Sequence, residues 1–290
     1  MISVSMYEEA IREHEKSFID NWSKAFCELK RAKNDENKMW LVGPSSYLFS
    51  IGGTKFAVDL QIRREKDILA IEDRICEDIS ALSFVLITHQ HNDHFCVPLI
   101  KRIAHMPVLW YLPAKMPARF IEAAGISEKN CVRLLHGDTF VRDGIRITAF
   151  DTPHVKPESH VELYELGYRI SSKDGSILLP GDVRDYNYCG YLDFVYSGAG
   201  GTDLCISHLW AGKNALDESA YMPVIKDFVD FSLRFNAKKY FICHLCDIGR
   251  KDIDMWHAEH ANAAAYLFKE KKAECLIEIP KGGCSYELFD

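Results

Sequence analysis

Residues 83–94 read Ser-Phe-Val-Leu-Ile-Thr-His-Gln-His-Asn-Asp-His and form the most informative stretch of this chain. The apolar, largely β-branched and aromatic residues at its start predict a buried strand. The loop that follows carries three histidines and one aspartate within six residues. Imidazole and carboxylate groups are the ligand types that hold Zn²⁺, Mn²⁺ and Fe²⁺ in proteins. The stretch therefore predicts a metal site, and the number of ligand groups favours two metal ions.

The composition is that of a soluble globular enzyme. The chain has 290 residues, of which 48% are hydrophobic and 27% are charged, so it is large enough for one large domain or two small ones. Its formal net charge is -7, whereas a nucleic-acid-binding surface is normally basic. We therefore expect a small-molecule substrate and do not expect a nucleic-acid partner.

The cysteines and the first residues bear on the cellular compartment. Ten cysteines are scattered along the chain, and Met1-Ile2-Ser3-Val4 lacks the basic region and apolar core of a signal peptide. These features predict free thiols in the reducing cytoplasm. No apolar run approaches the roughly 20 residues that cross a bilayer, so no membrane partner is expected.

The first part of the chain, residues 4–33, has apolar residues at helical spacing with charges between them. We expect this helix to pack on the edge of the domain. The alternatives are a lid or an oligomer contact, which leaves a homo-oligomer open. His14 lies in this helix and is interpreted as a surface or edge residue.

Strands and helices then alternate to the end of the chain. Strands are predicted at 40–43, 47–51, 55–59, 83–87, 107–111, 131–135, 144–151, 162–171, 175–180, 203–207, 239–243, 275–279 and 284–288. Helices are predicted at 67–78, 96–105, 115–124, 218–235 and 253–271. This alternation predicts an α/β protein, an αββα sandwich of two mixed sheets with outer helices. We expect one domain over residues 1–290, with 1–39 as an N-terminal helical extension.

Three more metal-ligand candidates follow apolar strands farther along the chain. His154 follows the strand at 144–151, Asp182 follows Pro180-Gly181, and His244 follows the strand at 239–243. Each one alone is more often a turn residue or a hydrogen-bonded structural residue. Strand ends of a layered fold can meet at one rim, however, and this is where sites are usually built.

Taken together, the candidates supply two groups of three ligands and one shared carboxylate. The first group is His89, His91 and His154. The second group is Asp93, His94 and His244, with Asp182 as a bridge between the two metals. Two cations about 3.5–4 Å apart would share a hydroxide that is a nucleophile near neutral pH. Asp93 and Asp182 are accordingly predicted to be catalytic.

Residues near these ligands are candidates for supporting and substrate-binding roles. Asp59 is either a carboxylate behind a metal-bound histidine or a loop-capping residue. His208 ends another strand and is predicted to donate a proton or hydrogen bond to the substrate, with a structural histidine as the alternative. Arg184 is predicted to pair with an anionic substrate group. Weaker candidates for the same role are Lys156, Lys213 and Arg63.

Other histidines and cysteines are given structural interpretations. Cys243-His244-Leu245-Cys246 contains a single C-x-x-C pair, which lacks the second pair of a zinc-finger spacing. Cys243 is therefore predicted to be a buried strand residue and Cys246 to be incidental. His257 and His260, three apart on a predicted helix, are expected to face solvent or to cap a charge.

The ligand set resembles the metallo-β-lactamase superfamily. Its H-x-H-x-D-H motif, third histidine, bridging aspartate and final histidine match residues 89–94, His154, Asp182 and His244, and the resemblance extends from Trp40 to the C-terminus. Within that superfamily the chain looks most like the L-ascorbate-6-phosphate lactonase-like branch. Three stretches carry this likeness, namely 40–59, His136-Gly137-Asp138-Thr139 and 166–182. His154 departs from the lactonase pattern, because a clear histidine at this position is not expected there.

The resemblance implies a metal-dependent hydrolase with two divalent ions, Zn²⁺, Mn²⁺ or Fe²⁺. The implied substrate is a small anion, such as a phosphorylated sugar lactone or a phosphodiester. Because the superfamily covers several hydrolytic reactions, the fold does not name the bond that is cleaved. A nuclease of the same superfamily, or a non-catalytic sensor that binds metal or ligand, remains the alternative.

Overall fold

The computed structural model describes residues 4–154, 163–184, 186, 201–246, 256–272 and 274–289. The first half of the chain contains α1 (Val4–Arg31), β1 (Lys38–Gly43), β2 (Ser46–Ile51), β3 (Thr54–Val58), α2 (Glu65–Ala70), α3 (Glu72–Ser80), β4 (Phe84–Leu86), α4 (Val97–Ile103), β5 (Leu109–Pro113), α5 (Ala118–Ala124), the 3-10 helix η1 (Glu128–Asn130) and β6 (Cys131–Leu134). The second half contains β7 (Thr139–Arg142), β8 (Ile145–Thr152), β9 (Glu165–Ser171), β10 (Ser176–Leu179), β11 (Leu204–His208), α7 (Glu218–Leu233), β12 (Lys239–Cys243), α8 (Ala258–Lys271), β13 (Leu276–Glu278) and β14 (Ser285–Glu287).

The strands form two seven-stranded mixed sheets. The first sheet has the order β14-β1-β2-β3-β4-β5-β6, and the second has the order β13-β12-β11-β10-β9-β8-β7. In each sheet, antiparallel hairpins lead into a set of parallel strands, with the change at β3 in the first and at β10 in the second. This architecture confirms the predicted αββα sandwich.

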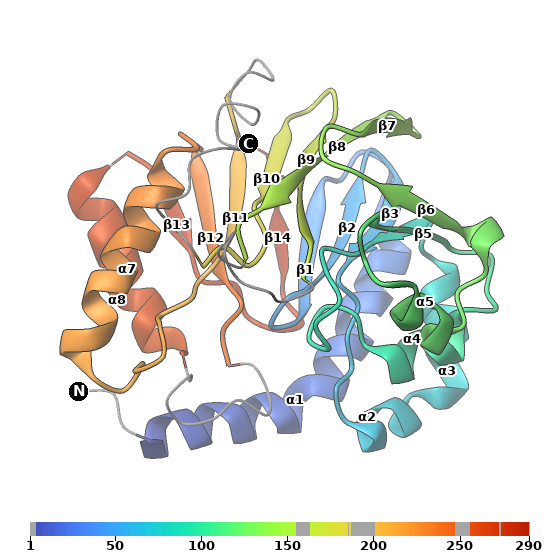
Figure 1. The fold of residues 1–290 in the computed structure, drawn as a ribbon, viewed down its shortest axis with the longest axis horizontal. Coiled ribbons are helices and arrows are strands. Elements are labelled where there is room, and N and C mark those ends of the chain that lie inside the picture. The colour runs from blue at the N-terminus through green and yellow to red at the C-terminus, as the bar shows by residue number, and fades with distance from the viewer. Residues whose placement is uncertain are drawn as a thin grey trace.

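The hydrophobic core is divided into three layers. Side chains from both sheets meet in the middle layer, where Phe56 and Tyr168 are fully buried. Helices α1 to α5 cover the outer face of the first sheet, and α7 and α8 cover that of the second (Figure 1). Helix α1 also extends across the lower edge of both halves in this view.

The clearest differences from the sequence prediction are a broken helix and an unpredicted strand. The single helix expected at 67–78 is two helices, because Ile71 leaves the helical conformation (φ -118°, ψ 11°) and buries its side chain. Strand β7 was not predicted, because its side chains are exposed or half-buried and give no buried alternation. The predicted helix start at 253 and strand start at 162 lie outside the described residues.

Two further expectations concern the cysteines and the membrane. Every cysteine in the described ranges is a free thiol, as predicted, and Cys243 is buried in β12. None of the helices built from described residues combines the length and the apolar character that crossing a bilayer requires.

Candidate metal centre

The loops after four strands bring the predicted ligands together. The segment after β4 carries His89 to His94, β8 leads to His154, β10 leads to Asp182 and β12 leads to His244. These strands belong to different sheets, so the site lies where the two sheets meet at one edge of the sandwich. All seven predicted ligand side chains take part in the groups of close donor atoms described next.

The first group joins His89, His91 and His154, whose candidate ligand atoms all lie within 4.8 Å of one another. His89 Nε2 is 2.9 Å from His91 Nδ1. His89 and His154 are buried, and His91 is half-buried. The structure therefore brings together the three residues that the sequence assigned to one metal.

The second group joins Asp93, His94 and His244 within the same 4.8 Å limit. His244 Nε2 is 3.3 Å from His94 Nε2 and 3.5 Å from Asp93 Oδ2. The backbone of His244 has φ 65°, a left-handed conformation that is uncommon for a residue with a Cβ and that concentrates at functional sites. The loop geometry thus directs this imidazole toward the other ligands.

Asp182 lies next to both groups. Its Oδ2 is 3.3 Å from His94 Nε2 and 3.5 Å from His244 Nε2. It also forms a group of close donor atoms with His89 and His94. This is the position that a bridging carboxylate requires, although the bridging role itself stays a prediction.

Asp59 supports the second group from behind. Its Oδ2 is 2.8 Å from His94 Nδ1 and accepts a hydrogen bond of 2.7 Å from the Thr88 hydroxyl. Its Oδ1 accepts the Thr88 backbone N–H at 2.7 Å. A carboxylate on Nδ1 fixes the ring so that Nε2 faces the ligand group, as metal-bound histidines require. Of the two interpretations from sequence, this geometry favours the carboxylate behind a ligand.

Glu165 supports the first group in the same way, and the sequence did not single it out. Its Oε2 is 2.5 Å from His154 Nδ1, and its Oε1 is 3.4 Å from His89 Nδ1. Oε1 also accepts the backbone N–H of Asp182 at 2.7 Å. Gly181 comes so close that a side chain there would collide with this carboxylate. In the sequence, Glu165 is one of several polar residues in a mixed strand, so nothing there distinguished it.

His208 is held at both ring nitrogens. Its Nδ1 is 2.6 Å from Asp182 Oδ1, and its Nε2 is 2.7 Å from the hydroxyl of Tyr47. Both partners are buried, and Tyr47 was not predicted from the sequence. His208 therefore lies against the Asp182 carboxylate, and one of its ring nitrogens is also within 4.8 Å of the donor atoms of Asp182 and His244. The predicted contact with substrate would require one of these hydrogen bonds to break.

The predicted anion-binding residues are placed differently. The Arg184 guanidinium lies 5.5 Å from the centre of the Trp210 ring and lines a small cavity together with Asp182 and His208. Lys213 is exposed and Arg63 is half-buried. Lys156 lies outside the described residues. Arg184 is therefore the basic side chain that the described structure places next to the ligand groups.

Burial and neighbouring charges have opposite effects on the pKa values of several residues in the site. Burial alone would lower the pKa of His94, but the carboxylates of Asp182, Asp59 and Asp93 raise it well above its usual value. Burial would raise the pKa of Asp182, but His244 and His94 lower it well below its usual value. Burial and the adjacent His89 lower the pKa of His91 to about 3. The neutral form of His91 is therefore favoured in the first group, whereas Asp182 stays ionised beside His94 and His244.

This donor set fits divalent metal ions. Imidazole nitrogens approach one another as closely as 2.9 Å in the first group and 3.3 Å in the second, with carboxylates beside them. Such convergence of nitrogen and oxygen donors matches the ligand preferences of Zn²⁺, Mn²⁺ and Fe²⁺. The donor types do not choose among these metals.

His257 and His260 do not face solvent as expected. His257 caps the start of α8 by accepting the backbone N–H of Glu259 at 3.2 Å, which is not the charge that was expected. His260 is fully buried, with Nε2 2.6 Å from the Ala215 carbonyl oxygen. The packing of α8 against the loop before α7 explains why both rings are buried. Both are structural residues of this helix.

Three solved structures illustrate the fold likeness. A possible metal-dependent hydrolase from Veillonella parvula aligns with a TM-score of 0.64 and 15% identity, over 87% of this chain and 99% of that chain. YhfI from Bacillus subtilis, a metallo-beta-lactamase fold protein, gives 0.59 and 16%, over 87% and 100%. CmlA from Streptomyces venezuelae, a diiron beta-hydroxylase, gives 0.62 and 15%, over 87% of this chain and 54% of that chain. The match thus spans about half of CmlA. At these identities the likeness shows the fold alone.

The family assignment rests on a match to a sequence model. No curated protein sequence is significantly similar to this chain. The family model described as "Beta-lactamase superfamily domain" matches residues 38–213, which is more than half of the chain. This match begins at β1 and includes His89, His154 and Asp182. The chain therefore belongs to the metallo-beta-lactamase superfamily.

Proposed function

We propose that this protein is a metal-dependent hydrolase of a small anionic substrate, such as a phosphorylated sugar lactone or a phosphodiester. The observation that carries the proposal is the position of Asp182 beside two groups of ligand side chains. The first group would hold one divalent ion and the second group another, either Zn²⁺, Mn²⁺ or Fe²⁺. Bound ions of this kind supply an activated water near neutral pH and stabilise the negative charge that develops on the substrate.

The chain's own residues orient that chemistry. Glu165 and Asp59 accept hydrogen bonds from the Nδ1 atoms of His154 and His94, which leaves each Nε2 facing the site. His208 holds the outer oxygen of Asp182, so the other oxygen stays directed at His94 and His244. Preorganised ligands of this kind avoid reorganisation during the reaction.

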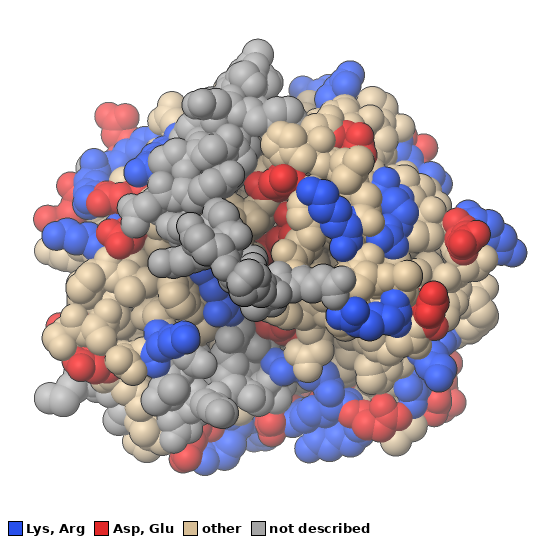
Figure 2. Space-filling view, viewed as in Figure 1, with Lys and Arg blue, Asp and Glu red and all other residues tan. Residues whose placement is uncertain are grey.

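The surroundings favour a small anion over a nucleic acid. Arg184 lines the small cavity beside Asp182, and an arginine there would form a charge-assisted pair with phosphate or carboxylate. Among the described residues on the face drawn in Figure 2, basic and acidic side chains are interspersed. Igni18 from Ignicoccus hospitalis, a metallo hydrolase, shares this fold at 14% identity with a TM-score of 0.57, so hydrolysis is one reaction that the fold can carry. The likeness to a diiron hydroxylase shows that fold alone does not determine the reaction.

The test is a substrate screen with protein reconstituted separately with Zn²⁺, Mn²⁺ and Fe²⁺. Phosphorylated sugar lactones, phosphodiesters and thioesters form the panel, and Asp182→Ala is the paired inactive variant. We expect turnover of an anionic lactone or phosphodiester that Asp182→Ala abolishes. Full metal occupancy without turnover of any panel member, together with tight binding of an intact ligand, would instead indicate a sensor.

A further inference from the structure

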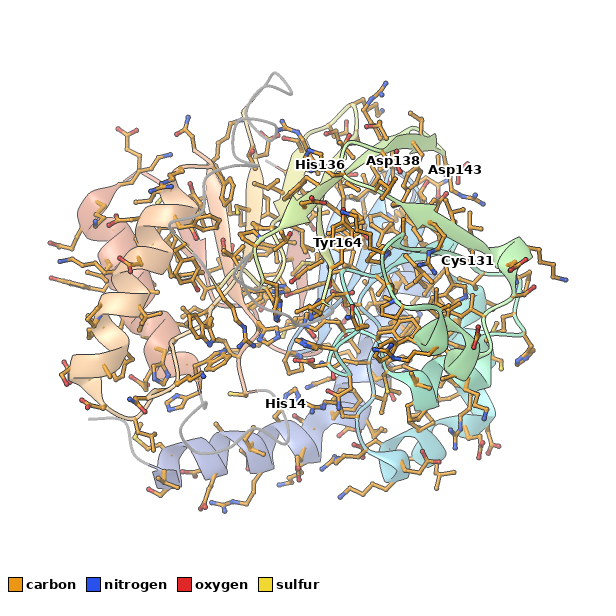
Figure 3. All side chains as sticks on the ribbon, viewed as in Figure 1. His14, Cys131, His136, Asp138, Asp143 and Tyr164 are labelled. Atoms are coloured by element: carbon orange, nitrogen blue, oxygen red, sulfur yellow. The ribbon has the colours of Figure 1, made fainter. Side chains whose placement is uncertain are left out.

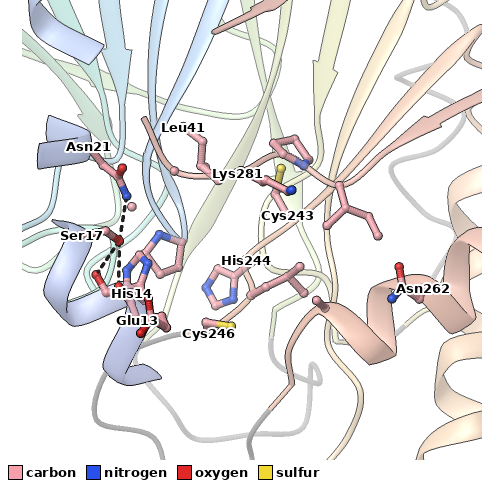
Figure 4. Close-up of a pocket in the computed structure, with 17 residues that line it drawn as sticks. Glu13, His14, Ser17, Asn21, Leu41, Cys243, His244, Cys246, Asn262 and Lys281 are labelled. Atoms are coloured by element: carbon pink, nitrogen blue, oxygen red, sulfur yellow. Dashed lines mark hydrogen bonds between the residues drawn. The ribbon is translucent and has the colours of Figure 1, made fainter. Parts of the chain in front are cut away.

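A large cavity opens beside the ligand groups at the edge that α1 crosses. Its volume is about 590 Å³, within the range of roughly 300–1,000 Å³ that is typical of small-molecule pockets. The walls come from α1, the end of β1, the segment after β12, the start of α8 and residues 279–282 (Figure 4). The N-terminal helix therefore forms part of a binding-sized cavity besides packing on the domain edge.

The cavity reaches the candidate metal centre through His244. This residue lines the cavity, while its Nε2 is 3.5 Å from both Asp93 Oδ2 and Asp182 Oδ2. Its backbone is fixed at both polar atoms, since its N–H donates to the Pro44 carbonyl at 2.9 Å and its carbonyl accepts the Trp256 Nε1–H at 2.9 Å. Of the seven candidate ligands, His244 is the one that lines this cavity, so a molecule whose reacting bond lies at the ligand groups would enter the cavity past His244.

The lining is mostly apolar and carries few charges. Leu41, Pro44 and Ile279 contribute apolar surface. Glu13 and Lys281 also line the cavity, and both are exposed, so one acidic and one basic group offset each other there. Such a surface favours binding of an uncharged, partly apolar portion of a molecule over binding of a second anionic group.

His14 adds a specific polar group to this lining. It projects from the side of α1 that faces the sheets (Figure 3). Its ring packs edge-on against that of Phe18, with 5.9 Å between the ring centres. Among the described residues, no hydrogen-bond partner reaches its buried Nε2 atom. Burial, with Arg64 nearby, lowers the pKa of His14 to about 4, so the ring is neutral at pH 7. A neutral imidazole in a cavity pairs well with a hydroxyl or amide group.

We infer that this cavity is the specificity pocket for the non-reacting part of the substrate, an uncharged and mainly apolar body with a hydroxyl or amide group that pairs with His14. The inference deepens the proposed function and rests on it for the position of the reacting bond. It narrows the substrate class to an amphiphilic molecule, with the hydrolysed group at one end and this body at the other.

The experiment uses lactams, which mimic lactones in shape but resist hydrolysis. Binding of 2-pyrrolidinone, 5-hexyl-2-pyrrolidinone and hexyl lactams with a hydroxyl at successive chain positions is measured by calorimetry on the full chain, zinc-bound and metal-free. We expect the hexyl chain to tighten binding about tenfold or more, because it buries apolar surface. We expect at least one hydroxyl position to tighten it about threefold further, and His14→Phe to remove only this gain.

Ser17→Trp fills the cavity from the adjacent turn of α1, and Asp20→Ala on the exposed side of the same helix is the matched control. Ser17→Trp should abolish the preference for the hexyl chain, whereas Asp20→Ala should keep it. Thermal unfolding confirms that each variant is folded. Ser17→Ala is a milder change at the same position, and it should keep the full preference for the hexyl lactam. Equal affinity for all lactams, or a preference that Ser17→Trp leaves intact, would overturn the inference. A chain preference without hydrolysis of any substrate would support the pocket while contradicting the hydrolase proposal.

Discussion

Glu165 connects the two groups of ligands through one buried carboxylate. Its Oε2 lies 2.5 Å from His154 Nδ1, and its Oε1 accepts the backbone N–H of Asp182 at 2.7 Å. The carboxylate is fully buried, and the histidines around it lower its pKa against the effect of burial. Glu165 thereby orients both His154, a ligand of the first group, and Asp182, which lies between the two groups.

Replacing this carboxylate with an amide should weaken metal binding. Glu165→Gln keeps the volume but removes the charge that stabilises the His154 N–H, and loss of such a partner lowers metal affinity by about 10–100-fold. Competition with a chromophoric chelator measures the change. Glu270→Gln, at an exposed position of α8, is the control and should bind metal like the unchanged protein. An unchanged metal affinity in Glu165→Gln would show that this carboxylate does not support metal binding.

Tyr47 should act on the reaction through His208. Because its hydroxyl is 2.7 Å from His208 Nε2, Tyr47→Phe frees that ring to move and loosens the Asp182 carboxylate that His208 holds. We expect kcat to fall about three- to tenfold, the usual effect of one lost hydrogen bond, with little change in KM. Steady-state kinetics on the substrate found in the screen provide the check. A rise in KM with normal kcat would show that His208 contacts the substrate, as the sequence suggested.

The two ligand groups should lose metal independently. Asp93 is a member of the second group, with Oδ2 3.5 Å from His244 Nε2. Asp93→Ala should therefore release the second ion more readily than the first, whereas His91→Ala should affect the first ion. Stepwise titration with a chelator separates the two affinities, and circular dichroism shows whether the fold is kept. Equal loss of both ions in each variant would contradict separate groups.

The sequence revealed the fold and the ligands because both follow patterns. Buried strands such as β4 and β12 are apolar runs, and ligands lie in the segments that follow them, as His244 follows β12. Glu165 and Tyr47 could not be found in this way, because each is a single residue within a strand and acts on partners far away in the chain. Tyr47 and His208, for example, are 161 residues apart and meet only when the two sheets pack. The break at Ile71 likewise depends on tertiary burial of that side chain.

His260 should make stability depend on pH. Burial lowers its pKa to about 4, from an unfolded value of 6.5. Its stabilising contribution is therefore complete above pH 6.5 and is lost as the pH falls toward 4, because the unfolded chain takes up a proton that the folded chain does not. Over this window the loss is about 2–3 kcal/mol. Urea unfolding at pH 7.5 and pH 4.5 should show a smaller loss for His260→Gln than for the unchanged protein.

The matched control for this prediction is His105→Gln, because His105 is exposed on the turn after α4. It should retain the full pH dependence. The same loss of stability in His260→Gln and His105→Gln would assign the effect to other groups.

The stoichiometry of bound metal tests the central claim most directly. The chain would be freed of metal, reconstituted with Zn²⁺, Mn²⁺ or Fe²⁺, and analysed by elemental mass spectrometry after removal of the excess. Two groups of ligands that share Asp182 predict about two equivalents per chain, falling to about one in Asp93→Ala. Well under one equivalent with every metal in the unchanged protein would contradict a dinuclear centre and the hydrolytic function built on it.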